Sequence, residues 1–484
     1  MIIIYLAMII LSSSIGSWVQ NAPDRLRTLL TTIVVNRTSV IIGSLFWLLI
    51  LSQEDLVKKE TVFVLPKHDV LKHVIFVVAV TFGIIERLSS SGNLISMERD
   101  WVVTVAAPPG QPYDLTHLNA VMRRIDLVCK LISPILISVV ISATGSVRIG
   151  VIYSALTSLV SIPIETISAK GVWNSSPLLR VPKSKKDPSA SGAASVPTPA
   201  VPWTGRVRQF FRGFEMYFST TVWVPSIALA LLHFNMMTWR ATFITYLINV
   251  GYSLPTITVA RAIGSVFEIS STVAAPLGIQ YMGKAYRQHR SLAGEEEQEL
   301  EVGLIETNEE QQQQHVIDGQ TLVGLQRFGL WGVSWQVLNL APVVAALWAI
   351  SSSRENQETT SSLASSTSSP GWGLSLVTFS FLSFSRFGVW VFDMTTQQLT
   401  QVLVPEHQRS KFAGVETSVV NVFEILGAAA AISFPRTEQF KWLSLASFVA
   451  VTISWALYAG WVREQRGHLL HWEKLRLWSR NSRR

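Results

Sequence analysis

Long apolar runs constrain this chain more than any other feature. A helix needs about 20 mostly apolar residues to cross a bilayer, and eleven stretches of the 484-residue chain reach that length with most charges near their ends. Only 15% of the residues are charged, against about 25% in an ordinary soluble domain. The sequence therefore predicts an all-α, polytopic membrane protein. Its expected spans lie near residues 1–19, 30–51, 70–94, 116–143, 147–169, 218–246, 256–282, 322–350, 372–400, 412–434 and 440–461.

A segment rich in Pro, Ser, Ala and Lys separates the fifth apolar run from the sixth. Its composition predicts a solvated cytoplasmic linker over residues 172–217. The linker separates an N-terminal bundle of five spans (1–171) from a C-terminal bundle of six spans (218–462). Many transporters are two six-helix halves related by an axis along the membrane normal. We therefore expect a major-facilitator-like fold of two bundles, 5+6 rather than 6+6, in which the first helix is missing.

The loops between the predicted spans differ strongly in charge. The chain has a formal net charge of +8, and Lys and Arg accumulate in cytoplasmic loops. The basic loops include the linker and the tail 463–484, which predicts that the C-terminus is cytoplasmic. The protein itself is expected in the plasma membrane or in an internal organelle membrane. We expect the tail to lie on the anionic inner leaflet rather than on nucleic acid. The polar stretches 284–320 and 351–371 lack periodicity and predict disordered loops.

Ionisable side chains inside the predicted spans mark candidate functional positions. Each costs a few kcal/mol at mid-bilayer, so it is expected to be paired, to face a water-filled cavity, or to be functional. Asn119, Arg123 and Asp126 lie at i, i+4 and i+7, on one face of a helix. An inner-side charge lock is one interpretation; direct cation coordination by Asp126 and a merely solvated helix end are the alternatives. The candidates in the N-terminal half are Glu86, Arg99, Asp100, Asn119, Arg123 and Asp126, of which Arg99, Asp100, Arg123 and Asp126 would form the lock.

The C-terminal half contains a second group of polar positions. Arg386 and Asp393 lie seven residues apart, two turns along one helical face. Glu416 and Glu424 follow on the next predicted span and are candidate cation ligands or proton acceptors, with a structural role open for Glu424. His233 is the only histidine well inside a span; it is a candidate Fe²⁺ ligand or a hydrogen-bonded packing residue. Four further charged residues are expected to be neutralising partners or helix-end charges, namely Glu165, Arg261, Glu268 and Arg327.

Motifs for enzymatic chemistry and ATP hydrolysis are absent from the sequence. No H-E-x-x-H, G-x-x-x-x-G-K-[ST] or G-x-S-x-G string occurs, so a zinc protease, a P-loop pump and a serine hydrolase are unsupported. The single cysteine, Cys129, excludes a disulfide framework and an iron–sulfur cluster. We predict no enzymatic activity and no cofactor. The expected partner is the lipid bilayer, and the chain is expected to be monomeric.

Two separated motifs resemble a known family. The string ERDWVV followed by LNAVMRRID, and RFGVWVFDMTTQQLTQ with GVETSVVNVFEIL, resemble signatures of the ferroportin family of iron exporters. GSWVQNAPDRLRTLL resembles the family's loop between its second and third helices. The resemblance implies a twelve-helix major-facilitator fold. It also implies export of ferrous or similar divalent ions from the cytosol, coupled to ion gradients rather than to ATP.

The resemblance also assigns site residues. By matching motif, Asn119, Arg123 and Asp126 fall in the family's inner gate region, Arg386 and Asp393 form a polar pair, and Glu424 lies near its second metal site. The chain departs from the family pattern at three positions. In an ungapped alignment, Ala241 and Gly427 stand where the family's second metal site has a cysteine and a histidine, and Ser17 stands where the family has an acid before a tryptophan. The family's first metal site uses a carboxylate on the missing helix. A non-transporting relative, a major-facilitator transporter of another substrate and a polytopic membrane enzyme remain the alternatives.

Overall fold

A computed structural model of the chain describes residues 1–59, 66–183, 203–292, 309–360 and 371–466. Within these residues the regular elements are helices, together with one isolated bridge between Ala107 and Asp114. The helices are α1 (Ile2–Asn21), α2 (Arg25–Lys59), α3 (Pro66–Ser96), η1 (Met97–Trp101), α4 (Val102–Val105), α5 (Leu115–Thr144), α6 (Val147–Ser175), α7 (Pro177–Arg180), α8 (Trp203–Ser219), α9 (Trp223–Leu231), η2 (Leu232–Phe234), α10 (Ala241–Asn249), α11 (Leu254–Leu292), α13 (Glu309–Thr360), α14 (Trp372–Leu403), α15 (Arg409–Ser433), η3 (Thr437–Gln439) and α16 (Phe440–Arg466).

Ten helices in the described part of the chain are long and apolar enough to cross a membrane. They correspond to ten of the eleven predicted spans, which confirms the all-helical, multi-span prediction. The spans are Ile2–Asn21, Arg25–Ser52, Val70–Val105, Leu115–Thr144, Val147–Ser175, Leu254–Lys284, Gly319–Ser353, Trp372–Leu403, Arg409–Ser433 and Thr437–Arg466.

The predicted span over residues 218–246 is not one helix. α9 ends at Leu231, the short 3₁₀ turn η2 follows, and the backbone leaves the helix before α10 begins at Ala241. The Asn235 side chain explains the break, because its Oδ1 accepts the backbone N–H of Met237 at 2.9 Å and so competes with helical hydrogen bonding. The backbone N–H of Met236 donates to Ser447 Oγ at 2.9 Å. Hydropathy alone does not reveal this local competition.

The predicted linker 172–217 contains ordered structure at both ends. α6 continues to Ser175, and α7 inserts Leu179, which is fully buried, into an apolar cluster with Trp101. At the other end, α8 ends beside Tyr217, whose ring stacks on Phe412 with 4.7 Å between centroids. Buried apolar side chains therefore hold both ends of residues 172–217 against the helices, although the composition of this segment predicted a solvated linker. The prediction of disordered loops over 284–320 and 351–371 is partly wrong, because residues 284–292 continue α11 and residues 309–320 and 351–360 belong to α13. The remainder of these loops and most of the tail 463–484 lie outside the described residues.

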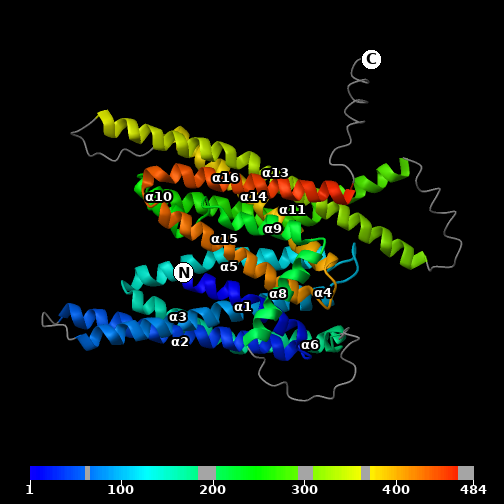
Figure 1. The fold of residues 1–484 in the computed structure, drawn as a ribbon, viewed down its shortest axis with the longest axis horizontal. Helices are drawn as coiled ribbons and strands as arrows, with labels where there is room; N and C mark the ends of the chain where they lie inside the picture. Colours follow the sequence, from blue (N-terminus) through cyan, green and yellow to red (C-terminus); the bar gives the residue numbers. More distant parts are fainter. Residues whose placement is uncertain (60–65, 184–202, 293–308, 361–370, 467–484) are drawn as a thin grey trace. The chain divides into compact units, whose positions relative to one another are not determined.

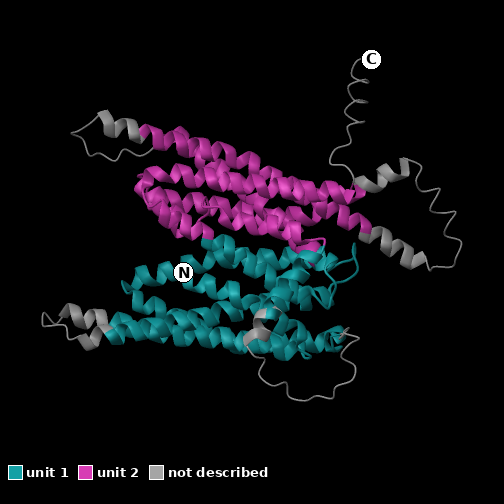
Figure 2. Ribbon diagram, in the orientation of Figure 1, with its two compact units in different colours: residues 1–220, 401–425 teal, residues 221–400, 426–484 magenta. Residues whose placement is uncertain are grey.

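The chain divides into two compact units, coloured separately in Figure 2. Unit 1 comprises residues 1–220 and 401–425, and unit 2 comprises residues 221–400 and 426–484. In unit 1, α2 packs against both α3 and α6, and α1 packs against α3 (Figure 1). In unit 2, α13 packs against α11 and α16, and α16 also packs against α9. Each unit is thus a helical bundle with its own core.

Close helix packing in unit 2 depends on a pair of glycines. A Cβ atom built on Gly388 of α14 would lie 2.4 Å from the carbonyl oxygen of Gly332 in α13. The same Cβ would lie 2.9 Å from the backbone nitrogen of Gln336. Small residues allow membrane helices to approach this closely, so the glycines set the distance between α13 and α14.

Candidate functional site

The third span ends in a turn of π-helix, η1, that carries two adjacent charges. Arg99 and Asp100 are both buried within it, as is Trp101. π-turns are rare and occur frequently at functional sites. Adjacent residues on a helix point in different directions, so Arg99 and Asp100 reach partners on different elements of unit 1.

Asp100 lies between two buried cations. Its Oδ1 is 2.7 Å from Arg25 Nε at the start of α2, and its Oδ2 is 2.8 Å from Lys183 Nζ. The side chains of Arg25, Asp100 and Lys183 are only 4%, 7% and 9% exposed, respectively. We call these three residues the Asp100 network. Buried charges are tolerated when they are paired and further hydrogen-bonded, so the network fixes the geometry of the elements that carry it.

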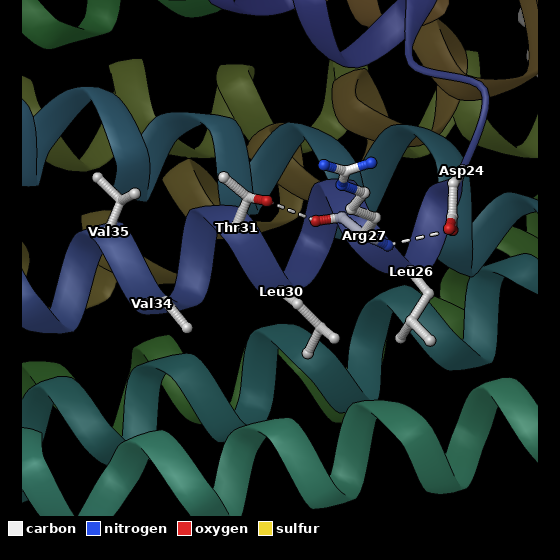
Figure 3. A pocket seen from close by; sticks show the side chains of 7 residues that line it. All are labelled: Asp24, Leu26, Arg27, Leu30, Thr31, Val34 and Val35. Atoms are coloured by element: carbon white, nitrogen blue, oxygen red, sulfur yellow. Dashed lines mark hydrogen bonds between the residues drawn. The ribbon is translucent and has the colours of Figure 1, made fainter.

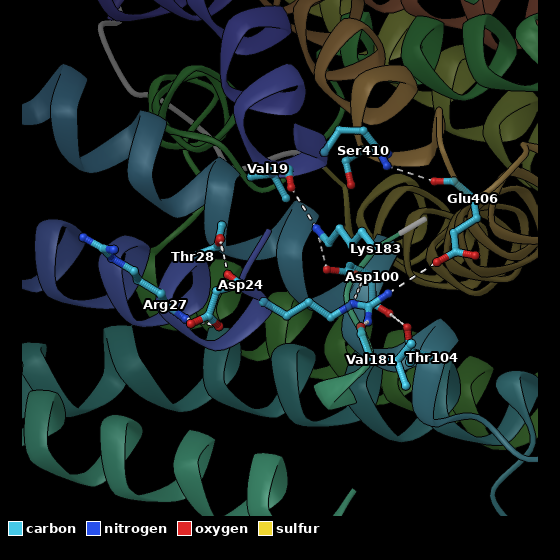
Figure 4. Close-up of polar contacts among 12 residues, drawn as sticks. Val19, Asp24, Arg27, Thr28, Asp100, Thr104, Val181, Lys183, Glu406 and Ser410 are labelled. Atoms are coloured by element: carbon cyan, nitrogen blue, oxygen red, sulfur yellow. Dashed lines mark hydrogen bonds and ion pairs between the residues drawn. The ribbon is translucent and has the colours of Figure 1, made fainter. Parts of the chain in front are cut away.

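Backbone carbonyls complete the Asp100 network. Lys183 Nζ also donates to the carbonyl of Val19 at 2.8 Å, as Figure 4 shows. Arg25 Nη1 donates to the carbonyl of Val181 at 2.5 Å, and its Nη2 lies 3.3 Å from the exposed Glu406. The network therefore links the end of α1, the start of α2, η1 and the strand-like segment after α7.

A second buried pair extends this polar region through unit 1. Arg99 Nη2 donates to Glu416 Oε2 of α15 at 2.6 Å, with both side chains largely buried. Asn119 Nδ2 of α5 donates to Gln401 Oε1 at 2.6 Å, and Gln401 Nε2 donates to the carbonyl of Glu98 at 2.7 Å. Arg99, Asn119 and Glu416 of the predicted set are thus held in one polar region around η1.

The four-residue lock predicted from Arg99, Asp100, Arg123 and Asp126 is wrong in its pairing. Asp100 pairs with Arg25 and Lys183 rather than with Arg123. Asp126 lies 2.7 Å from Lys130 Nζ and 3.5 Å from Arg123 Nη1, both on its own helix. Residues three and four apart on a helix are neighbours, which explains this local cluster. The Asp126 side chain is 38% exposed.

Sequence inspection missed several partners of the network. Hydropathy and motif spacing do not distinguish Arg25 and Lys183 from other loop charges, nor Glu406 and Gln401 from other polar residues. Arg25 carries a detectable signal, because it lies within the GSWVQNAPDRLRTLL segment that matches a family motif. Lys183 carries none, since its partner Asp100 is 83 positions away and nothing local indicates a long-range pair.

Two carboxylates elsewhere neutralise cations on other helices, so of the two alternatives for Glu165 and Glu268 the neutralising one applies. In unit 2, Arg386 Nε lies 2.6 Å from Glu268 Oε1, linking α14 to α11. In unit 1, Arg37 Nε donates to Glu165 Oε1 at 3.0 Å, linking α2 to α6. Glu86 accepts a longer contact of 3.5 Å from Asn36 Nδ2. These pairs satisfy charges inside membrane-length helices.

The predicted metal candidates do not form a ready-made cluster. Asp126 lies in α5, the buried Glu424 in α15, and His233 in η2 of unit 2. Asp393 lies half-buried in α14. In the described ranges no group of three or more His, Cys, Asp or Glu side chains is placed to hold a metal ion.

The break after α9 places a thioether opposite Gly427. A Cβ atom at position 427 would lie 3.1 Å from Met236 Cε, 3.8 Å from its Sδ and 3.7 Å from the carbonyl oxygen of Phe234. The ungapped alignment placed Ala241, not Met236, at the position that accompanies Gly427. The sulfur of Met236 is a soft donor that suits thiophilic metals.

The fold and its likenesses define the class of protein. A solved major-facilitator proton:xylose symporter, XylE, superposes with a TM-score of 0.52 at 10% identity, covering 94% of this chain and 84% of that one. A bacterial homologue of the iron transporter ferroportin, solved in an outward-facing state, gives a TM-score of 0.65 at 21% identity, with coverage of 95% and 88%. The chain has a major-facilitator-type fold.

Sequence comparison narrows this class to one family. The family model described as Ferroportin1 (FPN1) matches residues 2–285 and 320–451. Solute carrier family 40 member 1 of Oryza sativa subsp. japonica is 26% identical over 398 residues, which cover 81% of this chain and 70% of the relative. The chain belongs to the ferroportin family, as its two signatures predicted.

Proposed function

We propose that this protein is a multi-pass membrane transporter of Fe²⁺ or a similar divalent ion, and not an enzyme. The observation that carries the proposal is the family match, which spans both halves of the chain. A solved relative is named as a homologue of an iron transporter. The buried ion pairs around η1 support the proposal, because charge inside membrane-spanning helices is retained mainly for paired or functional roles.

The proposed mechanism is export by alternating access driven by ion gradients. Asp126 and Glu424 supply carboxylate oxygens for the ion; Asp126 is partly exposed and Glu424 is buried. The Asp100 network holds one end of unit 1 closed until its ion pairs are exchanged. The excess of Lys and Arg supports a cytoplasmic location for this end and for the C-terminus. The transporter works as a monomer in the plasma membrane or an organelle membrane.

Metal flux into proteoliposomes tests the proposed function. We expect purified protein to accelerate Fe²⁺ flux, and the Asp126→Ala, Glu424→Ala double variant to lower that acceleration about tenfold or more, because two ligands are lost. The matched control is Glu464→Ala, which removes an exposed carboxylate at the end of α16. Equal flux in the wild type and the double variant would reject the assigned ligands, and wild-type flux at the level of empty liposomes would reject transport.

A second candidate function rests on one departure from the family. Gly427 stands where the family has a metal-binding histidine, and Met236 rather than a cysteine faces it. A non-transporting relative would be expected to lose this site. The absence of wild-type flux, together with undetectable binding of Co²⁺ by the folded protein, would favour the second candidate.

Introducing a cysteine and a histidine at the facing positions 236 and 427 is expected to strengthen metal binding. The Met236→Cys, Gly427→His double variant places a thiolate and an imidazole in contact, because the replaced groups already approach within 3.8 Å. We expect Co²⁺ to bind about tenfold more tightly, with a thiolate-to-cobalt charge-transfer band. The control pairs Met236→Cys with Gly460→His, since a Cβ at Gly460 meets nothing within 4 Å. Equal Co²⁺ affinity in both double variants would contradict the assignment.

A further inference from the structure

A groove outside the polar network runs along the first turns of α2. Its volume is about 430 Å³. Figure 3 shows two rows of side chains on this helix, each with a spacing of four residues. The apolar row is Leu26, Leu30 and Val34, and the second row is Arg27, Thr31 and Val35, with Asp24 at the end of the groove. Eight residues of helix span about 12 Å, enough for the upper part of a fatty acyl chain.

Two opposite charges lie at one end of the groove. Asp24 and Arg27 are both exposed. The Asp24 carboxylate accepts the backbone N–H of Arg27 at 3.1 Å, which caps the start of α2. The two side chains do not form an ion pair with each other, and among the described residues the Arg27 guanidinium has no hydrogen-bond or ion-pair partner. An exposed cation and an exposed anion are therefore both available to a ligand.

The setting selects the class of ligand. α2 is one of the membrane-length helices, and the groove lies at the end of its apolar stretch. Val34 and Val35 are 42% and 38% exposed, which suits contact with lipid tails. Basic side chains near the end of a membrane-length helix attract lipid phosphates, and a carboxylate three residues earlier attracts an ammonium group.

We propose that this groove binds an aminophospholipid, with its phosphate on Arg27, its primary ammonium on Asp24 and one acyl chain between the two rows. Phosphatidylethanolamine has this combination of groups. Phosphatidylcholine lacks ammonium N–H donors, and phosphatidylglycerol lacks the ammonium altogether. The groove would therefore discriminate between headgroups through two charges, independently of whether the protein transports metal.

Native mass spectrometry of the full chain, titrated in detergent with each of three phospholipids sharing the same acyl chains, tests the proposal. We expect phosphatidylethanolamine to bind about fivefold more tightly than phosphatidylcholine, since one favourable charge contact near the interface contributes about that factor. Arg27→Gln should weaken all three lipids. Asp24→Asn, which keeps a good helix cap, should abolish only the preference for phosphatidylethanolamine.

Further variants separate the groove from general surface charge. Arg463→Gln removes an exposed arginine from the end of α16 and should leave all three affinities within twofold. Val34→Trp fills the groove without changing charge and should weaken all three lipids. Soluble phosphoethanolamine at the same concentration should not compete, because it lacks the acyl chain. Equal affinity for phosphatidylethanolamine and phosphatidylcholine, or wild-type binding by Arg27→Gln, would overturn the proposal; tryptophan fluorescence melting confirms that each variant is folded.

Discussion

Replacing Asp100 with alanine is expected to destabilise the protein by about 3–5 kcal/mol, because it leaves two buried cations without their shared carboxylate. Arg25 and Lys183 are 4% and 9% exposed, so water does not replace the lost partner. The unfolding midpoint should fall by roughly 6 °C or more. Thermal unfolding followed by tryptophan fluorescence in detergent measures this change.

A control variant at another carboxylate and a rescue variant test whether the uncompensated charges cause the loss of stability in Asp100→Ala. Asp126→Ala removes a side chain that is 38% exposed and paired on its own helix; pairs of this kind contribute about 1 kcal/mol or less. Adding Arg25→Met and Lys183→Met to Asp100→Ala removes the stranded charges and should recover part of the stability. A triple variant no more stable than Asp100→Ala would show that packing, not uncompensated charge, causes the loss.

The second large loss of stability is expected for the substitution Gly388→Ala. Its Cβ in Gly388→Ala would lie 2.4 Å from the backbone oxygen of Gly332, a contact that no side-chain rotation relieves. α13 and α14 must therefore separate, and overpacking of this kind costs about 1–3 kcal/mol. Thermal unfolding and the yield of monodisperse protein both report the change.

The control for this prediction makes the same glycine-to-alanine substitution at a different glycine of unit 2. Gly460 lies in α16, where a Cβ atom meets nothing within 4 Å. Gly460→Ala should leave stability unchanged or raise it slightly, since alanine has the higher helix propensity. If both alanine variants melt at the wild-type temperature, the close approach of α13 and α14 does not limit stability.

Hydropathy predicted most of the fold because a membrane helix needs a long apolar run, which is a local property. The failure at residues 218–246 has an equally local cause: Asn235 accepts the N–H of Met237, and this hydrogen bond ends the helix within an apolar segment. The apolar Leu179 and Tyr217 likewise anchor segments whose overall composition is that of a linker. Average composition conceals such single anchoring residues.

The candidate site was only partly predictable. Charge inside a span identified Arg99, Asp100 and Glu416, since such residues are rare enough to stand out. Their partners could not be identified, because pairing across helices depends on the rotation of each helix. η1 changes that rotation within one turn, and nothing in the string MERDW indicates a π-turn in advance. Asp126 therefore pairs along its own helix, and Asp100 pairs with residues that the sequence places far away.

The π-turn at Met97–Trp101 affects how the side chains of the third span can reorient. A π-turn accommodates one residue more than an α-helix would over the same rise. If this surplus residue moved to a position after Trp101, the side chains between the two positions would turn by about 100°. Arg99 and Asp100 would then face away from Glu416 and Arg25, and both pairs would open in a single step. The two ion pairs share no atom, yet both depend on the geometry of the same π-turn.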